Sequence, residues 1–279
     1  MRFLPVLRGT LLVAALIYGA LGAELWFVQD RLVFPGAFGG LHDPAEVAQT
    51  AAASRLVRVD IPRADGPAVT VWTRDGHHGR LLLWFHGNGE TAAVSGAMAD
   101  AAEAMGWDFV AVEYRGFADV PGAPSEAGLV ADARVAWDWA VSTGGWAPAR
   151  VVIQGGSLGG GVAVALASQV DAAGLVISST FDSLKGVAAE RFPMFPVASL
   201  LRTTFDSVAL APKVSEPVLQ LHSRDDRTVP FSHGERLRDA LPHVTFVPLE
   251  GWGHAGSYLR QDAGAAAAWK AFLDGVVPQ

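Results

Sequence analysis

Cysteine is absent from the 279-residue chain, which excludes disulfides, zinc–thiolate sites, iron–sulfur clusters and a cysteine nucleophile. Charged residues are also scarce, at 18% against about 25% in ordinary soluble domains. Lys and Arg together number 21 and Asp and Glu 28, which gives a formal net charge of −7. No basic cluster offsets this acidic balance, so the sequence argues against a nucleic acid as partner.

Long hydrophobic runs are rare as well, and a single stretch near the start approaches the length of a membrane-spanning helix. Arg2 and Arg8 precede the uncharged run 9–23, and after Glu24 another apolar turn extends to Val28. One such run does not make a multi-pass membrane protein. With 51% hydrophobic residues, the chain is also too apolar to be disordered.

Three interpretations of residues 1–28 follow from this pattern. We expect a membrane anchor: its basic residues would stay on the cytoplasmic side, and the domain 29–279 would lie on the outer, extracytoplasmic side. A signal peptide cut near Ala20-Leu21-Gly22 would instead give a secreted protein. A buried helix of a soluble protein fits less well, because the segment has no polar face.

From residue 29 onward, strand-like and helix-like patterns alternate, which favours a mostly parallel sheet with helices on both faces. We expect eight strands, over 55–61, 69–73, 80–85, 107–113, 151–154, 175–178, 218–222 and 244–249. We expect helices over 92–105, 125–142, 160–169, 232–240 and 263–273. The segment 181–212 breaks the alternation, and we expect a short helical lid there, inserted into one α/β domain.

A Gly-x-Ser-x-Gly motif, Gly155-Gly156-Ser157-Leu158-Gly159, lies between an expected strand and an expected helix. This arrangement is typical of a nucleophile elbow, in which a sharp turn exposes the serine Oγ. The backbone N–H of Leu158 would point into the same space and could bind an oxyanion. The structural alternative is an ordinary Gly-rich turn with a helix-capping serine. A phosphate-binding loop is excluded because no Lys-Ser or Lys-Thr pair follows the glycines.

A serine nucleophile needs a base, and the base needs a carboxylate that orients it. Asp225 and Asp226 follow the seventh expected strand, and His254 follows the eighth within a Gly-rich loop. The chain order serine, acid, histidine predicts a triad of Ser157, His254 and one of the two aspartates. The alternatives are an aspartate paired with a neighbouring arginine and a solvated loop histidine.

His86-Gly87-Asn88-Gly89 follows the third expected strand, where a second oxyanion donor arises in this topology. The backbone N–H of Asn88 would join that of Leu158 in binding the oxyanion. His86 comes too early in the chain order to be the base, and we expect it to hold the loop. The other histidines lack metal-ligand spacing, and the chemistry requires no metal and no organic cofactor.

With these residues in place, the sequence resembles the α/β-hydrolase superfamily, in particular its N-terminally membrane-anchored serine hydrolases. These include serine-aminopeptidase-like bacterial hydrolases and eukaryotic protein depalmitoylases. The likeness runs from about residue 29 to residue 272. Besides the motifs above, it includes the segments 29–35, 114–117 and 122–126. His222 with Asp226, Val229 and Pro230 is similar to the acid motif of the family. The resemblance therefore implies an α/β-hydrolase fold and favours Asp226 over Asp225 as the acid.

Four positions depart from the family pattern without removing a candidate catalytic group, and one of them is Ala255, which follows His254 where asparagine is common. Ser223 stands where glycine usually follows the histidine of the acid motif. Ala118 and Val120 replace a glycine and a serine in the segment after Tyr114. These changes reshape loops around the site, so the resemblance does not specify the substrate.

We expect a serine hydrolase that cleaves carboxylic ester or thioester bonds through an acyl-enzyme intermediate. The segment 181–212 is rich in apolar residues that could bind lipophilic acyl chains or simply pack on the core: Phe192, Pro193, Met194, Phe195, Pro196, Leu200, Leu201 and Phe205. The expected partners are therefore a small-molecule or lipid-like ester and, through residues 1–28, the membrane.

Two other functions remain open at this point. An amidase or peptidase could use the same triad, although no acidic anchor for a substrate terminus is identified. A membrane-tethered binding module with an inherited fold would be non-catalytic, and the complete triad argues against it.

Overall fold

A single sheet lies at the centre of the computed structural model, which describes residues 3–38, 43–63, 66–254 and 261–278. Within these residues, eight strands pair in the order β1-β2-β4-β3-β5-β6-β7-β8. All eight strands predicted from the sequence are present: β1 (Val57–Ile61), β2 (Val69–Arg74), β3 (Leu81–Phe85), β4 (Asp108–Val112), β5 (Val151–Gly156), β6 (Gly174–Ser178), β7 (Val218–Ser223) and β8 (Val244–Leu249).

The sheet is mostly parallel. β2 pairs antiparallel with β1 and with β4, and every pair from β4 through β3 to β8 is parallel. The strands β3 to β7 are buried on both faces, as expected for nearly continuous apolar runs in a parallel sheet. The carboxyl ends of β3, β5, β7 and β8 therefore meet at one edge, where ligands bind in sheets of this kind.

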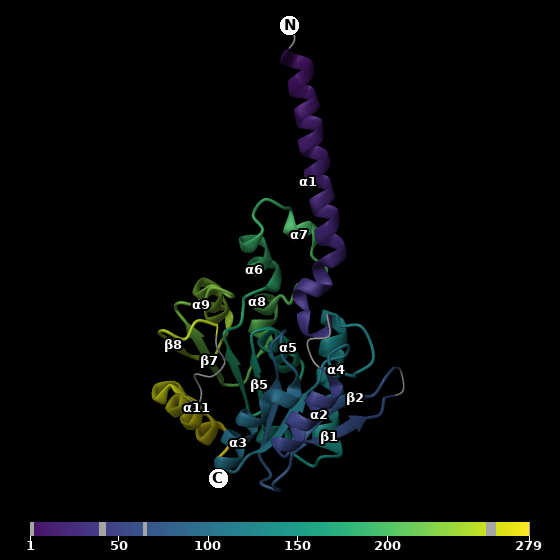
Figure 1. Ribbon diagram of the computed structural model, residues 1–279. Helices are drawn as coiled ribbons and strands as arrows, with labels where there is room; N and C mark the ends of the chain where they lie inside the picture. The colour runs from purple at the N-terminus through teal and green to yellow at the C-terminus, as the bar shows by residue number, and fades with distance from the viewer. Residues whose placement is uncertain (1–2, 39–42, 64–65, 255–260, 279) are drawn as a thin grey trace.

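Helices cover both faces of the sheet (Figure 1), which confirms the predicted fold class. The longer helices of this layer are α2 (Pro44–Ala53), α3 (Gly96–Ala104), α4 (Glu126–Ser142), α5 (Leu158–Ala167), α9 (Phe231–Ala240) and α11 (Ala263–Val276). Short 3-10 turns are η1 (Pro35–Ala37), η2 (Ala92–Ser95) and η3 (Pro148–Arg150). The helix expected over 92–105 thus starts as η2 before α3, and α2 has no counterpart among the predicted helices.

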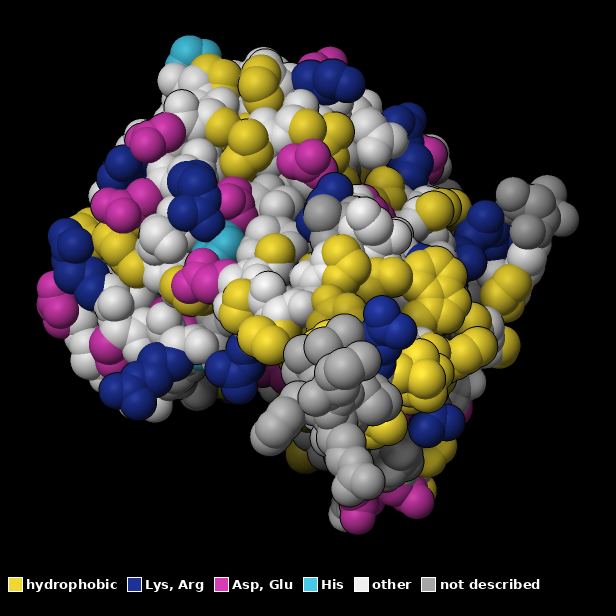
Figure 2. All heavy atoms as spheres, turned by 90° about the horizontal axis from the view of Figure 1, so that it is seen from above, with side chains coloured by type: hydrophobic (Ala, Val, Ile, Leu, Met, Phe, Trp, Pro, Cys, Tyr) yellow, Lys and Arg dark blue, Asp and Glu magenta, His cyan; other side chains and the backbone are white. Residues whose placement is uncertain are grey.

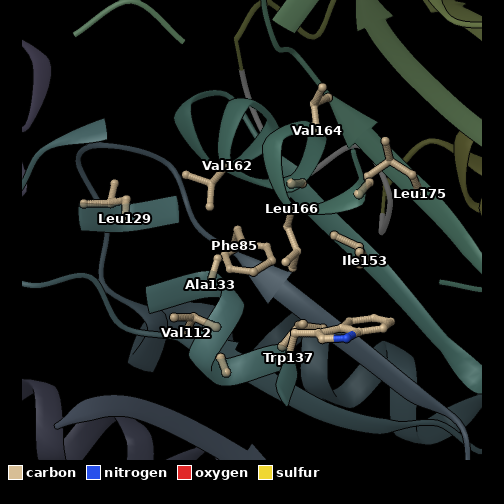
Figure 3. Close-up of a cluster of buried hydrophobic side chains, with 14 of the residues drawn as sticks. Phe85, Val112, Leu129, Ala133, Trp137, Ile153, Val162, Val164, Leu166 and Leu175 are labelled. Carbon is tan, nitrogen blue, oxygen red and sulfur yellow. The ribbon is translucent and has the colours of Figure 1, made fainter. Parts of the chain in front are cut away.

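Two hydrophobic clusters, one on each face, hold these layers together. Along β3, Leu81, Leu83 and Phe85 belong to one cluster and Leu82 belongs to the other, as the two-residue period of a strand requires. Figure 3 shows the cluster in which strand residues meet the side chains of α4 and α5, among them Trp137. This packing fixes the strands whose ends carry the candidate site.

The N-terminal helix α1 (Phe3–Val33) projects from the body of the molecule (Figure 1). Its stretch Arg8–Val33 is long and apolar enough to cross a membrane, and none of its most apolar window is buried. An exposed helix of this kind does not fit the buried-helix interpretation. α1 runs past the expected limit at Val28, and Val33 and Phe34 enter the hydrophobic core.

The segment 181–212 contains three short helices, and its upper part lies beside α1 (Figure 1): α6 (Leu184–Arg191), α7 (Val197–Leu200) and α8 (Ser207–Leu210). The turn η4 (Ala211–Lys213) then leads toward β7. A β-bridge between Ser183 and Asp206 closes the base of this segment. The Glu126 carboxylate of α4 also accepts hydrogen bonds from the N–H groups of Thr204 and Phe205, at 2.7 and 2.9 Å.

Candidate active site

Ser157 lies in the turn between β5 and α5, with φ 52° and ψ −119°. A positive φ is unusual for a residue with a side chain, and such strain persists only where the surroundings hold it. The Ser157 N–H donates to Ser178 O at 2.9 Å, and its carbonyl accepts from Thr180 Oγ1 at 2.7 Å. The Ser157 side chain makes no helix-capping hydrogen bond, so the interpretation as a capping serine does not apply.

Glycines beside Ser157 allow backbone segments to approach too closely for any side chain. A Cβ on Gly155 would lie 2.1 Å from the carbonyl oxygen of Gly159. A Cβ on Gly159 would lie 2.1 Å from the carbonyl oxygen of Phe85, at the end of β3. The Gly-x-Ser-x-Gly motif is therefore required by the packing of this turn against β3, and that packing presents the Ser157 hydroxyl at the sheet edge.

Ser157, His254 and Asp226 form a continuous hydrogen-bonded chain, although they come from three separate loops. His254 Nε2 lies 3.0 Å from Ser157 Oγ, and His254 Nδ1 lies 2.8 Å from Asp226 Oδ2. Both distances fall within the range for a nucleophile, a base and an orienting carboxylate. The structure thus brings together the three side chains that the sequence singled out.

The Asp226 carboxylate has no exposed surface but many hydrogen-bond donors. Its Oδ1 accepts from the N–H groups of Thr228 and Val229 at 2.8 and 2.9 Å. Burial by itself raises the pKa of this carboxyl, but hydrogen bonds from His222 and His254 outweigh that effect and hold the pKa well below its usual range. Asp226 is therefore an anion beside the imidazole, and neighbouring Arg224 pairs with Glu250 instead.

Asp225 is hydrogen-bonded to the loop that carries the imidazole. Its two carboxylate oxygens accept from the N–H groups of Gly251 and Gly253, at 3.0 and 3.2 Å. Ser223 Oγ donates to Asp225 at 2.6 Å and accepts from Trp252 N–H at 3.2 Å. Ser223, one of the departures from the family pattern, thus joins Asp225 in fixing this loop.

Asn88 and Leu158, the residues expected to bind an oxyanion, both line the cavity that contains Ser157. The loop of Asn88 is tied to the end of α1: Asn88 Nδ2 donates to Val33 O at 3.1 Å, and Gly36 N–H donates to Asn88 O at 3.0 Å. His86 is fully buried, with Nδ1 2.8 Å from Gly87 O, and holds this loop as expected.

The cavity beside Ser157 has a volume of about 240 Å³ and is predominantly apolar. One wall comes from the segment 181–212, including Leu184, Phe192, Phe195 and Leu201. Of the described residues in this lining, Arg191 alone carries a charged side chain. Among the described residues, no group of three His, Asp or Glu side chains is placed to hold a metal ion.

Two sets of site residues were not singled out from the sequence. The first is Ser178, at the end of β6, and Thr180, in the loop that follows, which are hydrogen-bonded to Ser157 and have no motif of their own. The second is the wall of the cavity opposite the segment 181–212, which α1 provides through Leu25, Trp26 and neighbours. The apolar run at the N-terminus indicated a membrane helix, and nothing in it indicated contact with the site.

The chain is similar to several known proteins, some of which are hydrolases. A family model of serine aminopeptidases matches residues 76–195. An uncharacterized protein of Mycobacterium tuberculosis is 33% identical over 257 residues, which cover 91% of this chain and 88% of that protein. Lysophosphatidylserine lipase ABHD12 of Xenopus tropicalis is 30% identical over 197 residues, 61% of this chain and 50% of that protein. The crystal structure of an esterase from Pyrococcus furiosus aligns with a TM-score of 0.65 at 16% identity, over 84% of this chain and 95% of that one.

Proposed function

The chain belongs to the α/β-hydrolase superfamily and is a hydrolase, and from that premise we propose that it cleaves carboxylic esters or thioesters with Ser157 as nucleophile. The observation that carries this proposal is the hydrogen-bonded chain from Ser157 Oγ through His254 to Asp226, at 3.0 and 2.8 Å. It stands beside an apolar cavity, which suits the acyl part of an ester better than a charged substrate.

In the proposed reaction, Ser157 Oγ attacks the acyl carbon while His254 Nε2 takes the hydroxyl proton. The carbonyl oxygen becomes an oxyanion, which the backbone N–H groups of Leu158 and Asn88 stabilise. The bond between acyl carbon and leaving group then breaks, and His254 gives its proton to the departing alcohol or thiol. Water, deprotonated by the same histidine, hydrolyses the acyl-enzyme and regenerates Ser157.

Asp226 has two tasks in this scheme. As an acceptor for His254 Nδ1 it keeps the proton off Nε2, so that Nε2 can act as the base. As an anion with a lowered pKa it stabilises the imidazolium that forms when the proton leaves Ser157. No step needs a metal or an organic cofactor.

The proposal also covers the setting of the enzyme. We assign α1 as a membrane anchor that leaves the domain 29–279 on the outer side, and the segment 181–212 as a lid over the site. The expected partners are a lipid-like ester and the membrane, with no nucleic acid. The length and apolar character of α1 support the anchor. The similarity to a lysophosphatidylserine lipase supports an ester of a lipid.

A second candidate is hydrolysis of an amide or peptide, because the matching family model is that of serine aminopeptidases. An aminopeptidase needs an anion that binds the substrate's terminal ammonium group. The described residues that line the cavity include no Asp or Glu, so the geometry favours the ester. If the protein hydrolysed aminoacyl naphthylamides faster than esters, the amidase or peptidase function would be favoured over the esterase function.

The direct test compares Ser157→Ala with the purified wild-type protein on p-nitrophenyl esters. We expect kcat to fall by about 10³-fold or more, because the acyl-enzyme can no longer form. Ser215→Ala is the matched control, since Ser215 is an exposed loop serine, and we expect it to retain full activity. Equal activity in Ser157→Ala and the wild type would refute the assignment of the nucleophile.

A further inference from the structure

The helix that could cross a membrane also forms one wall of the cavity beside Ser157. Leu25, Trp26, Gln29, Leu32 and Val33, all in the last part of α1, line this cavity. An anchor that merely tethers a domain does not contribute to its site. Here the apolar surface next to the nucleophile is continuous along α1 with the surface suited to a bilayer.

Polar contacts fix the wall that α1 forms to the wall that the segment 181–212 forms. Gln29 is only 6% exposed, and its Nε2 donates to Leu200 O at 3.3 Å while its Oε1 accepts from Arg202 N–H at 2.8 Å. Arg202 also pairs with Asp30 at 2.8 Å and lies over the ring of Trp26. A buried, fully paired glutamine between α1 and α7 sets the width of the cavity.

Further along α1, a second set of contacts reaches the tip of the segment 181–212. The Tyr18 hydroxyl donates to Met194 O at 2.5 Å, and its ring stacks on that of Phe195 with centroids 5.1 Å apart. Gly22 lies one turn from Tyr18, and its position faces the same Phe195 ring. The two walls thus stay together well beyond the level of Gln29.

The face from which α1 leaves the body is apolar. Figure 2 looks down on it and shows a group of hydrophobic side chains with several Lys and Arg side chains among and around them. Phe27 and Met194 are 79% and 75% exposed, and Trp26 and Phe192 are each 37% exposed. Large apolar and aromatic side chains exposed at the base of a membrane helix suit the interface between lipid and water.

We propose that the cavity between α1 and the segment 184–201 is an acyl-chain pocket, and that its substrates are lipid esters held in the same bilayer as α1. The acyl chain would lie along Leu25 and Leu32 with its carbonyl at Ser157, and the polar alcohol would leave toward water. This inference rests on the proposed ester hydrolysis and adds the substrate class, its route of entry and a binding role for α1.

A pocket of this kind makes hydrolysis depend on chain length. Each methylene that moves from water into an apolar site favours binding about fourfold, until the pocket is full. We therefore expect kcat/KM of the full-length protein in detergent micelles to rise by about 100-fold or more from p-nitrophenyl butyrate to the laurate. The laurate-to-butyrate ratio of kcat/KM is the quantity to follow.

Substitutions on α1 test whether this helix is the wall. In Leu25→Trp the larger ring would fill part of the pocket, and we expect the laurate-to-butyrate ratio to fall by about tenfold or more. Leu32→Trp is a second probe of the same wall. Leu16→Trp is the matched control: Leu16 is 64% exposed on the same helix and does not line the cavity, so the ratio should stay at the wild-type value.

Vesicles test the route of entry. With the protein reconstituted in phosphatidylcholine vesicles, we expect 4-methylumbelliferyl palmitate to be hydrolysed about tenfold faster or more when it shares those vesicles than when it arrives in separate ones. Equal initial rates would overturn entry from the bilayer. An unchanged laurate-to-butyrate ratio in both Leu25→Trp and Leu32→Trp would overturn the pocket.

Failure of the pocket is distinguishable from failure of the proposed function. A wild-type protein that reacts with a fluorophosphonate and hydrolyses butyrate, yet shows no gain from butyrate to laurate, contradicts the pocket alone. A folded wild-type protein that neither reacts with a fluorophosphonate nor hydrolyses any ester contradicts both.

Discussion

At the scale of single residues, two adjacent aspartates after β7 have different roles because they face different partners. Asp226 is buried and accepts from His254, whereas Asp225 accepts from the N–H groups of Gly251 and Gly253. The first sets the tautomer of the candidate base, and the second sets the position of the loop that carries it. Chain order alone leaves both aspartates open as the acid, and the resemblance to the acid motif of the family favours Asp226. The loop-fixing role of Asp225 follows only from its contacts in the fold.

Asp226→Asn and Asp225→Asn should therefore differ in their kinetics. An amide at position 226 leaves the tautomer of His254 unfixed, and we expect kcat to fall by about 10⁴-fold. An amide at position 225 weakens contacts to the loop alone, and misplacement of the base should cost less than about 100-fold. Steady-state hydrolysis of a p-nitrophenyl ester measures both. Equal losses would contradict the division of roles.

The lowered pKa of Asp226 also predicts a pH dependence of stability. Because its pKa in the folded state lies below the unfolded value of about 3.9, the ionised carboxylate stabilises the fold above that pH. The contribution is lost progressively as the pH falls below about 5. The free energies of unfolding of the wild type and Asp226→Asn in urea should differ by about 2 kcal/mol at pH 7, and this difference should shrink progressively as the pH is lowered from about 5 to about 3. A constant difference over this range would be inconsistent with the lowered pKa.

At the scale of elements, the turn between β5 and α5 depends on the close approach of three chain segments. Gly155 and Gly159 are the contact points. Thr180, in the loop after β6, donates a hydrogen bond to Ser157 O, and nothing in the sequence predicts this contact. The strained φ of Ser157 is thus maintained by packing on both sides.

Gly159→Ala tests this packing. The new Cβ would lie 2.1 Å from the carbonyl oxygen of Phe85, and we expect the free energy of unfolding to fall by about 3 kcal/mol or more. Gly275→Ala in α11 is the control, since nothing lies within 4 Å of its added Cβ, and it should be neutral or stabilising by up to about 1 kcal/mol. Denaturant unfolding measures both, and a neutral Gly159→Ala would show that the turn is loosely packed.

The elements best predicted from the sequence were those with strong local patterns. All eight strands are apolar or alternating runs, and the motif around Ser157 carries its own glycine spacing. α2 is not among the predicted helices although Asp43 caps it and Pro44 begins it, because Val47 is its single large apolar residue. The short helices of 181–212 were not located individually, since contacts such as that of Glu126 with Thr204 come from distant parts of the chain.

At the scale of the whole molecule, α1 joins three parts that could have been independent. Its exposed length suits a membrane, Gln29 and Tyr18 bind the segment 181–212, and Val33 is hydrogen-bonded to Asn88 beside the site. The boundary expected at residue 28 falls inside this continuous helix. Membrane attachment and the shape of the cavity are therefore coupled through one element.

This coupling predicts that the helix is retained. After expression in a bacterial host, the protein should stay in the membrane fraction after carbonate extraction and should begin at or near Met1. Cleavage near residues 20–22 would remove Tyr18 and its contacts with Met194 and Phe195. A soluble product that begins close to Ala23 would instead identify a signal peptide, and a soluble product that begins at Met1 would exclude both an anchor and a signal peptide.

The central claim, that Ser157 is the nucleophile of an esterase, is tested most directly by mapping a covalent adduct. The protein would be treated with a fluorophosphonate, digested and analysed by mass spectrometry. We predict one adduct per chain on Ser157, none in Ser157→Ala, and much slower formation in His254→Ala because the base is missing. An adduct on another serine, or unchanged labelling of Ser157→Ala, would contradict the account.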